Sequence, residues 1–142
     1  MSWDVMIFNF DGAPAPVLDD WKHGDNKPLG PTQEVRNHIA RTLFHTDWSD
    51  PNWGVHEGDG FSIEFNVDKQ DPPENMMLHI RGGGGNVIAA IRRFAEPAGW
   101  VAMDVSSGDW IDLSQSTCPG WEGWQGFRDH VTDQHAPDDG SQ

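Results

Sequence analysis

Glu64, His79 and Arg81 are the residues of this chain whose types and spacing come nearest to acid–base chemistry. Glu64 lies in the segment FSIEFNV, and the other two lie in MMLHIR. If these segments pair as neighbouring strands, the carboxylate lies near the imidazole or the guanidinium, and a carboxylate beside an imidazole orients a general base. We favour an ordinary cross-strand charge pair, because the sequence fixes no nucleophile nearby.

Three further features could bind a ligand, and each has a simpler interpretation. The run GGGGN at 82–86 matches neither a dinucleotide fingerprint nor a phosphate loop, so we interpret it as a flexible joint. The seven histidines include no His-Glu-x-x-His pair, and the EGDG turn lacks calcium-loop spacing, so we predict no metal and no cofactor. Cys118 is the single cysteine, and it carries no protease signature.

A second group of residues combines acidity with tryptophan in DWSDPNWG and in the segment that follows it. Indoles give a large contact area with few rotatable bonds, and carboxylates attract a basic surface. We therefore predict a protein-binding site formed by Asp47, Trp48, Asp50, Trp53, Glu57 and Asp59.

The charge balance narrows the class of partner. The chain has 23 acidic and 9 basic residues, a formal net charge of -14, which repels nucleic acids and anionic membranes. A basic protein would be attracted, although the acidity also serves solubility. No run approaches the roughly 18–20 apolar residues of a membrane span, and no signal peptide is visible, so we expect a cytoplasmic protein.

The elements that position these residues centre on a meander from Trp53 to Arg81. The segments WGVHE, FSIEFNV and MMLHIR are separated by the turns EGDG and DKQDPPEN. In the middle segment apolar and polar residues alternate from Phe61 to Asp68, which is typical of a strand with one buried face. The polar face carries Glu64, and on the third segment we expect His79 and Arg81 beside it.

Other segments complete the predicted fold. SWDVMIFNF is apolar on both faces and predicts an interior strand, and residues 11–31 predict a long loop that caps the core through Val17, Leu18 and Trp21. We expect a helix from an N-cap at Thr32 to near Phe44, and a turn at 49–51. A second helix should follow Asn86 and stop at Pro97 and Gly99. Strands WVAMDVSS and WIDL and a closing helix through Trp121, Trp124, Phe127 and Val131 should follow.

This order, β-α-β-β-β-α-β-β-α, predicts an α+β fold with a mostly antiparallel sheet and helices mainly on one face. We expect residues 1–131 to form a single domain and residues 132–142 to be a disordered acidic tail.

The segments MSWDVMIFNF, WSDPNWGVHEGDGFSIEFNV and GWVAMDVSSGDW are similar to a set of small bacterial proteins without an assigned activity. Those proteins resemble, in size and layout, the single-domain immunity proteins encoded beside secreted toxins. The resemblance implies neutralisation of a toxin and carries over no active-site residue.

The sequence therefore predicts a monomeric or homodimeric binding module for a basic protein, with a toxin as the expected partner. No motif fixes a reaction, so we favour binding over catalysis. Two alternatives stay open. One is a small hydrolase-like enzyme using Glu64 and His79, and the other is a small-molecule-binding sensor domain.

Overall fold

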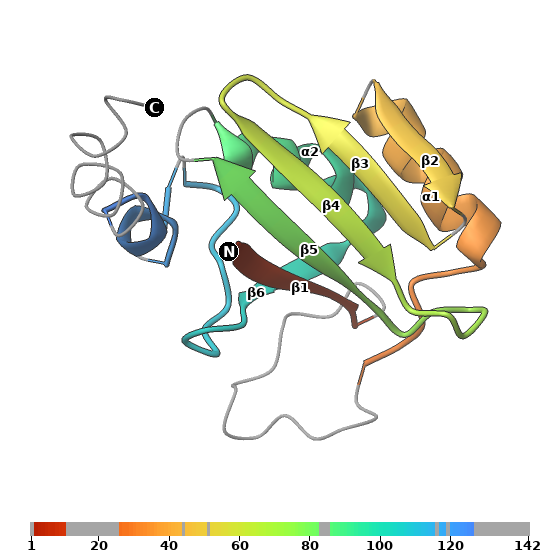
Figure 1. Cartoon of the computed structure of the whole chain (residues 1–142). Helices are drawn as coiled ribbons and strands as arrows, with labels where there is room; N and C mark the ends of the chain where they lie inside the picture. The colour runs from red at the N-terminus through yellow and green to blue at the C-terminus, as the bar shows by residue number, and fades with distance from the viewer. Residues whose placement is uncertain are drawn as a thin grey trace.

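One six-stranded antiparallel sheet organises the chain, in an α+β fold (Figure 1). The computed structural model describes residues 2–10, 26–43, 45–50, 52–82, 86–115, 117–118 and 120–126. The elements follow in the order β1 (Trp3–Asn9), α1 (Thr32–Thr42), β2 (Thr46–Asp50), β3 (Trp53–Glu57), β4 (Phe61–Val67), β5 (Asn75–Gly82), α2 (Val87–Ala98) and β6 (Trp100–Asp104). A further helical segment covers 120–126.

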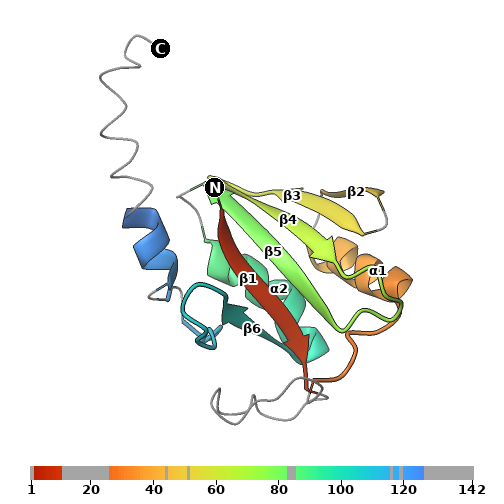
Figure 2. The same cartoon turned by 60° about the horizontal axis from the view of Figure 1, so that its bottom comes forward.

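The strands lie side by side in the order β2-β3-β4-β5-β1-β6, and each neighbouring pair is antiparallel. Helices α1 and α2 cover one face of the sheet, as predicted (Figures 1 and 2). The segment 120–126 lies at the end of the sheet where the chain begins (Figure 2). We call the face turned away from α1 and α2 the open face.

Alternating side chains explain why the core lies between the sheet and the two helices. In β4, Ile63, Phe65 and Val67 are fully buried, while the residues between them are part-exposed or exposed. Such alternation sends successive side chains to opposite faces of a strand. The same period places Val5 and Ile7 in the core and leaves Asp4 and Met6 on the open face.

The predicted meander is confirmed, because β3, β4 and β5 pair consecutively through the predicted turns. The interior position of β1, between β5 and β6, is also confirmed. The sequence did not predict β2, which pairs with β3. The predicted WIDL strand is reduced to an isolated bridge between Met103 and Trp110.

The helix ends differ slightly from the predicted ones. Pro31, not Thr32, is the N-cap of α1, and the backbone N–H of Thr32 donates to Asp71 Oδ1 at 3.0 Å. That carboxylate supplies the acceptor that the first turn of a helix needs. Helix α2 continues through Pro97 to Ala98 before Gly99, at φ 72°, ends it in the left-handed conformation that glycine adopts without strain.

Several predicted features lie outside the described residues. These are the capping loop with Val17, Leu18 and Trp21, Phe127 and Val131 of the closing helix, and the tail at 132–142. Helix α1, predicted to end near Phe44, ends at Thr42 with Leu43 as its C-cap. Within the described part of the chain, no helix has both the length and the apolar character needed to span a bilayer.

Candidate functional site

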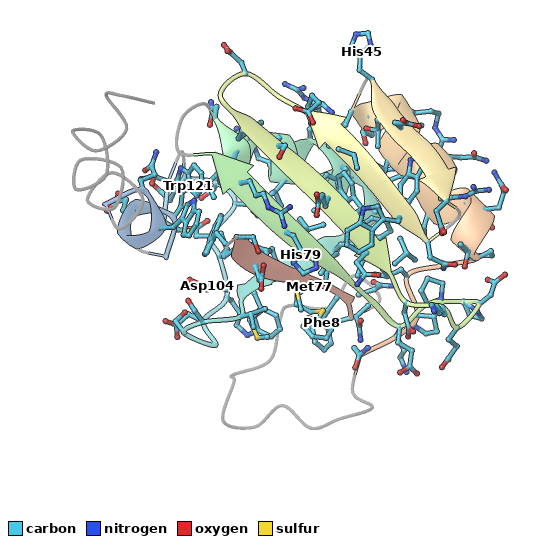
Figure 3. All side chains as sticks on the ribbon, in the orientation of Figure 1. Phe8, His45, Met77, His79, Asp104 and Trp121 are labelled. Atoms are coloured by element: carbon cyan, nitrogen blue, oxygen red, sulfur yellow. The ribbon has the colours of Figure 1, made fainter. Side chains whose placement is uncertain are left out.

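The open face brings together side chains from all six strands. Figure 3 shows Met77 and His79 on this face, with Asp104 and Trp121 near the end of the sheet where the chain begins. The register places Met77 of β5 beside Met6 of β1, and Met6 beside Met103 of β6. All three methionines are partly buried, so a flexible apolar row crosses one half of the open face.

Trp53 is the most prominent residue on the other half. Its side chain is 37% exposed, and only Trp53 and Val105 are exposed large hydrophobic residues in the described part of the chain. The indole stacks on the imidazole of His79, with centroids 5.9 Å apart and planes 24° apart. A part-exposed, stacked indole is a typical anchor for a binding partner.

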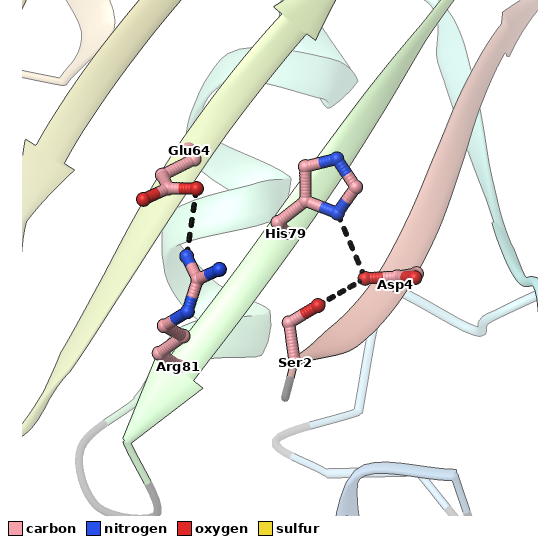
Figure 4. A network of polar contacts seen from close by, with 5 residues as sticks. All are labelled: Ser2, Asp4, Glu64, His79 and Arg81. Carbon is pink, nitrogen blue, oxygen red and sulfur yellow. Dashed lines mark hydrogen bonds and ion pairs between the residues drawn. The ribbon is translucent and has the colours of Figure 1, made fainter.

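The three candidate catalytic residues form two separate pairs (Figure 4). Glu64 lies directly opposite His79 in the register, yet its carboxylate binds Arg81 at 2.7 Å. His79 instead places Nδ1 2.9 Å from Asp4 Oδ1 of β1. The favoured cross-strand charge pair therefore forms between Glu64 and Arg81, whereas His79 pairs with Asp4 and not with Glu64. The sequence analysis did not single out Asp4, because β1 and β5 are distant in sequence.

The residues of the predicted protein-binding site do not all lie on one face. Asp47 faces Val55, and Asp50 faces Trp53, so both belong to the open face. Glu57 lies at the end of β3, Asp59 lies in the following turn, and all four carboxylates are exposed.

Trp48 is the exception. Its ring centroid lies 6.0 Å from that of Phe65, on the helix-covered side. A Cβ added at Gly54 would meet its indole at 2.8 Å, so the ring lies directly over this glycine. Trp48 is thus an anchor for β2 in the core. Of the two indoles in the predicted protein-binding site, only that of Trp53 lies on the open face.

A cavity of about 730 Å³ lies at the end of the sheet, and the sequence analysis did not anticipate it. Its lining comes from the start of β1, the turn after β6 and the helical segment 120–126. The side chain of Trp121 is buried against Trp3, with ring centroids 5.2 Å apart. Trp124 Nε1 donates to the carbonyl of Gly82 at 2.9 Å, which holds the helical segment against β5.

Asp104 lines this cavity and is 3% exposed, the single buried charged side chain among the described residues. Its Oδ1 accepts from the Ser106 backbone N–H at 3.0 Å and from the Ser106 hydroxyl at 2.8 Å. Its Oδ2 lies 1.7 Å from the point that a Cβ on Gly120 would occupy. One sequence signal was available, because the alternation of β6 gives Asp104 the same inward face as Trp100 and Ala102.

Two side chains near the cavity have shifted pKa values. Burial raises the pKa of the Cys118 thiol above its ordinary value, so this thiol stays protonated at neutral pH. The hydroxyl of Ser114, followed by its backbone N–H, lowers the pKa of Asp112, because hydrogen bonds stabilise the carboxylate. Neither shift by itself creates a reactive group.

No group of three or more His, Cys, Asp or Glu side chains in the described residues is arranged to hold a metal ion. Comparison of the chain with protein-family models, curated proteins and solved structures gives no match.

Proposed function

We propose that this chain is an acidic binding module that takes a basic protein on the open face around Trp53. We further propose that it acts in the cytoplasm as an inhibitor of the toxin-immunity kind. The exposed indole among carboxylates is the observation that carries the proposal. Nucleic acids and anionic membranes are not proposed as partners, because a net charge of -14 opposes both.

The surroundings of Trp53 support this choice of partner. Asp50 lies directly opposite Trp53 on β2, and Asp47 and Glu57 lie on the same two strands. A central aromatic anchor ringed by charges is the arrangement found at interfaces, where the anchor supplies affinity and the charges supply association rate. A basic surface would complement the carboxylates and cover the indole.

Catalysis has weaker support than binding. Glu64 is engaged by Arg81, and His79 is held between Asp4 and the indole of Trp53. These contacts make a continuous scaffold under the exposed indole. A partner would therefore meet a preorganised surface, which lowers the entropic cost of binding.

The test is co-expression of the chain with the protein encoded by the neighbouring gene, followed by titration calorimetry of the complex at low and high salt. Two double variants remove the same charge from opposite sides of the molecule. D47N/E57Q neutralises exposed carboxylates of β2 and β3, and E34Q/E96Q neutralises exposed carboxylates of α1 and α2.

We expect a complex whose affinity falls with salt and whose association slows in D47N/E57Q but not in E34Q/E96Q. Replacing the anchor in W53A should weaken binding about thirtyfold, or roughly 2 kcal/mol, as at interface hot spots. Growth in the presence of the neighbouring protein should then depend on Trp53. Absence of a complex, or equal weakening by the two double variants, would refute the proposal.

A further inference from the structure

The cavity beside Asp104 has the size and construction of a small-molecule site. Its volume of about 730 Å³ lies within the range of ligand pockets, which is roughly 300–1,000 Å³. Three segments distant in sequence form it, and two tryptophan contacts fix the helical segment that closes it. Such anchoring preserves the shape of the cavity without a ligand.

Among the described residues that line the cavity, every charged side chain is a carboxylate. Asp4, Asp104 and Asp109 belong to the lining, and the described residues of the lining include no Lys, Arg or His. Asp104 is the critical member, because its carboxylate is buried and the described part of the lining offers it no basic side chain. A buried carboxylate favours a cation as its neighbour.

A second feature points to a ligand independently of the acidity. Trp3 is 4% exposed, and its Nε1–H has no hydrogen-bond partner within the described part of the chain. This nitrogen lies 3.3 Å from the same Gly120 reference point that Asp104 Oδ2 approaches. A buried indole N–H normally finds an acceptor, so Trp3, which also lines the cavity, keeps an unused donor beside the Asp104 carboxylate.

The indoles that line the cavity are a third feature that favours a cationic ligand. Trp3, Trp110 and Trp124 all line the cavity. Aromatic rings attract ammonium and guanidinium groups, most strongly where water is excluded. Carboxylate, indoles and a free N–H donor together match a cation that carries an oxygen acceptor nearby.

We propose that this cavity binds an organic cation, an ammonium or guanidinium group, with its positive charge against Asp104 and an adjacent oxygen accepting from Trp3 Nε1. The inference does not rest on the proposed protein partner, because small molecules test it directly. An anion would meet three carboxylates, and a neutral ligand would leave the charge of Asp104 unmatched.

Such a cationic group has two possible sources, a free small organic cation or a Lys or Arg side chain of the partner. Asp4 both lines the cavity and binds His79, which stacks on Trp53, so the cavity adjoins the proposed protein-binding face. A partner on the open face could thus extend a side chain into it. The two sources are separated by the choice of probe.

The experiment titrates the full chain with four probes and follows the assigned Trp3 indole N–H resonance by NMR. Choline, a quaternary ammonium ion, represents a free small organic cation, and Nα-acetyl-lysinamide and Nα-acetyl-argininamide represent side chains. The neutral alcohol 3,3-dimethylbutan-1-ol has the shape of choline without its charge. We expect at least one cation to shift the resonance with saturation, and the alcohol to leave it unchanged.

Two variants test the site itself. D104N keeps an oxygen that accepts from Ser106 but removes the charge, and it should weaken the bound cation at least tenfold. G123L fills the cavity, because Gly123 belongs to its lining and a Cβ there meets no atom within 4 Å. G126L is the matched control on the same helical segment, outside the lining.

Loss of cation binding in G123L but not in G126L supports the proposal even if D104N is too unstable to measure. Preference for choline assigns the cavity to free small organic cations, and preference for a blocked amino acid assigns it to the side chain of a partner. The proposal is overturned if no cation shifts the resonance, if the neutral alcohol binds as well as choline, or if folded D104N binds unchanged. Because these outcomes concern the cavity alone, they are distinguishable from failure of the complex around Trp53.

Discussion

Trp53 stacks on His79 across the intervening strand β4, with ring centroids 5.9 Å apart. His79 holds Asp4 at 2.9 Å, and Asp4 lines the cavity at the end of the sheet. Two side-chain contacts thus join the exposed indole to the cavity. A ligand in the cavity and a protein on the open face would bind to one connected group of side chains.

The stacked pair predicts a measurable coupling between Trp53 and His79. In a double-mutant cycle of W53A and H79A, we expect a coupling free energy of about 0.5–1 kcal/mol, because aromatic pairs contribute about this much beyond buried area. Urea unfolding of the four proteins measures it. The control cycle pairs W53A with R81A, since Arg81 instead binds Glu64. Equal coupling in the two cycles would contradict the specific stacking.

The sequence predicts the meander well because its signal is local. Alternation in β4 and turn residues on either side determine strand, face and connection together. The prediction from sequence fails at β2, because the segment DWSD has the composition of a turn. This segment becomes a strand through tertiary contacts, since Trp48 packs over Gly54 and against Phe65. The local strand propensity of a segment carries no information about contacts with residues distant in sequence.

The candidate site was harder to predict than the fold for the same reason. The register of β2 against β3 shifts between Asp47 and Asp50, and no sequence pattern reports this irregularity. Because of this shift, Asp50 lies opposite Trp53 on the open face, although simple alternation from Asp47 would turn it to the other side. The inward position of Asp104 was visible in the alternation of β6, but its approach to Gly120 depends on how distant segments pack.

Gly54→Ala should destabilise the protein by about 1–3 kcal/mol, the usual cost of overpacking a core. The added methyl would lie 2.8 Å from the Trp48 indole, which packs against Phe65 at the edge of the core. Urea unfolding and the near-UV circular dichroism of the tryptophans measure the change. The effect should shrink when Trp48 is first replaced by leucine. An undiminished cost in that background would show that the indole is not the obstacle.

Replacing two glycines of the helical segment 120–126 by alanine should change the free energy of unfolding in opposite directions. Gly120→Ala places a methyl against the Asp104 carboxylate and should cost about 1–3 kcal/mol in free energy of unfolding. Gly123→Ala meets no atom within 4 Å and should gain about 0.5–1 kcal/mol from helix propensity. Thermal and urea unfolding compare the two. A gain in both variants would contradict the close approach of Asp104 and Gly120.

We expect the buried thiol of Cys118 to make the folded protein less stable at alkaline pH. Burial raises the pKa of its thiol in the folded state above the unfolded value of about 8.5. The neutral thiol therefore favours folding fully below about pH 8.5, and this contribution is lost as the pH rises through the folded pKa. The sequence contains no tyrosine, so no phenol titrates in the same range. The urea concentration at the midpoint of unfolding should decrease more between pH 7 and pH 10 in the wild type than in C118A. An equal decrease in the two proteins would show that the buried thiol does not contribute.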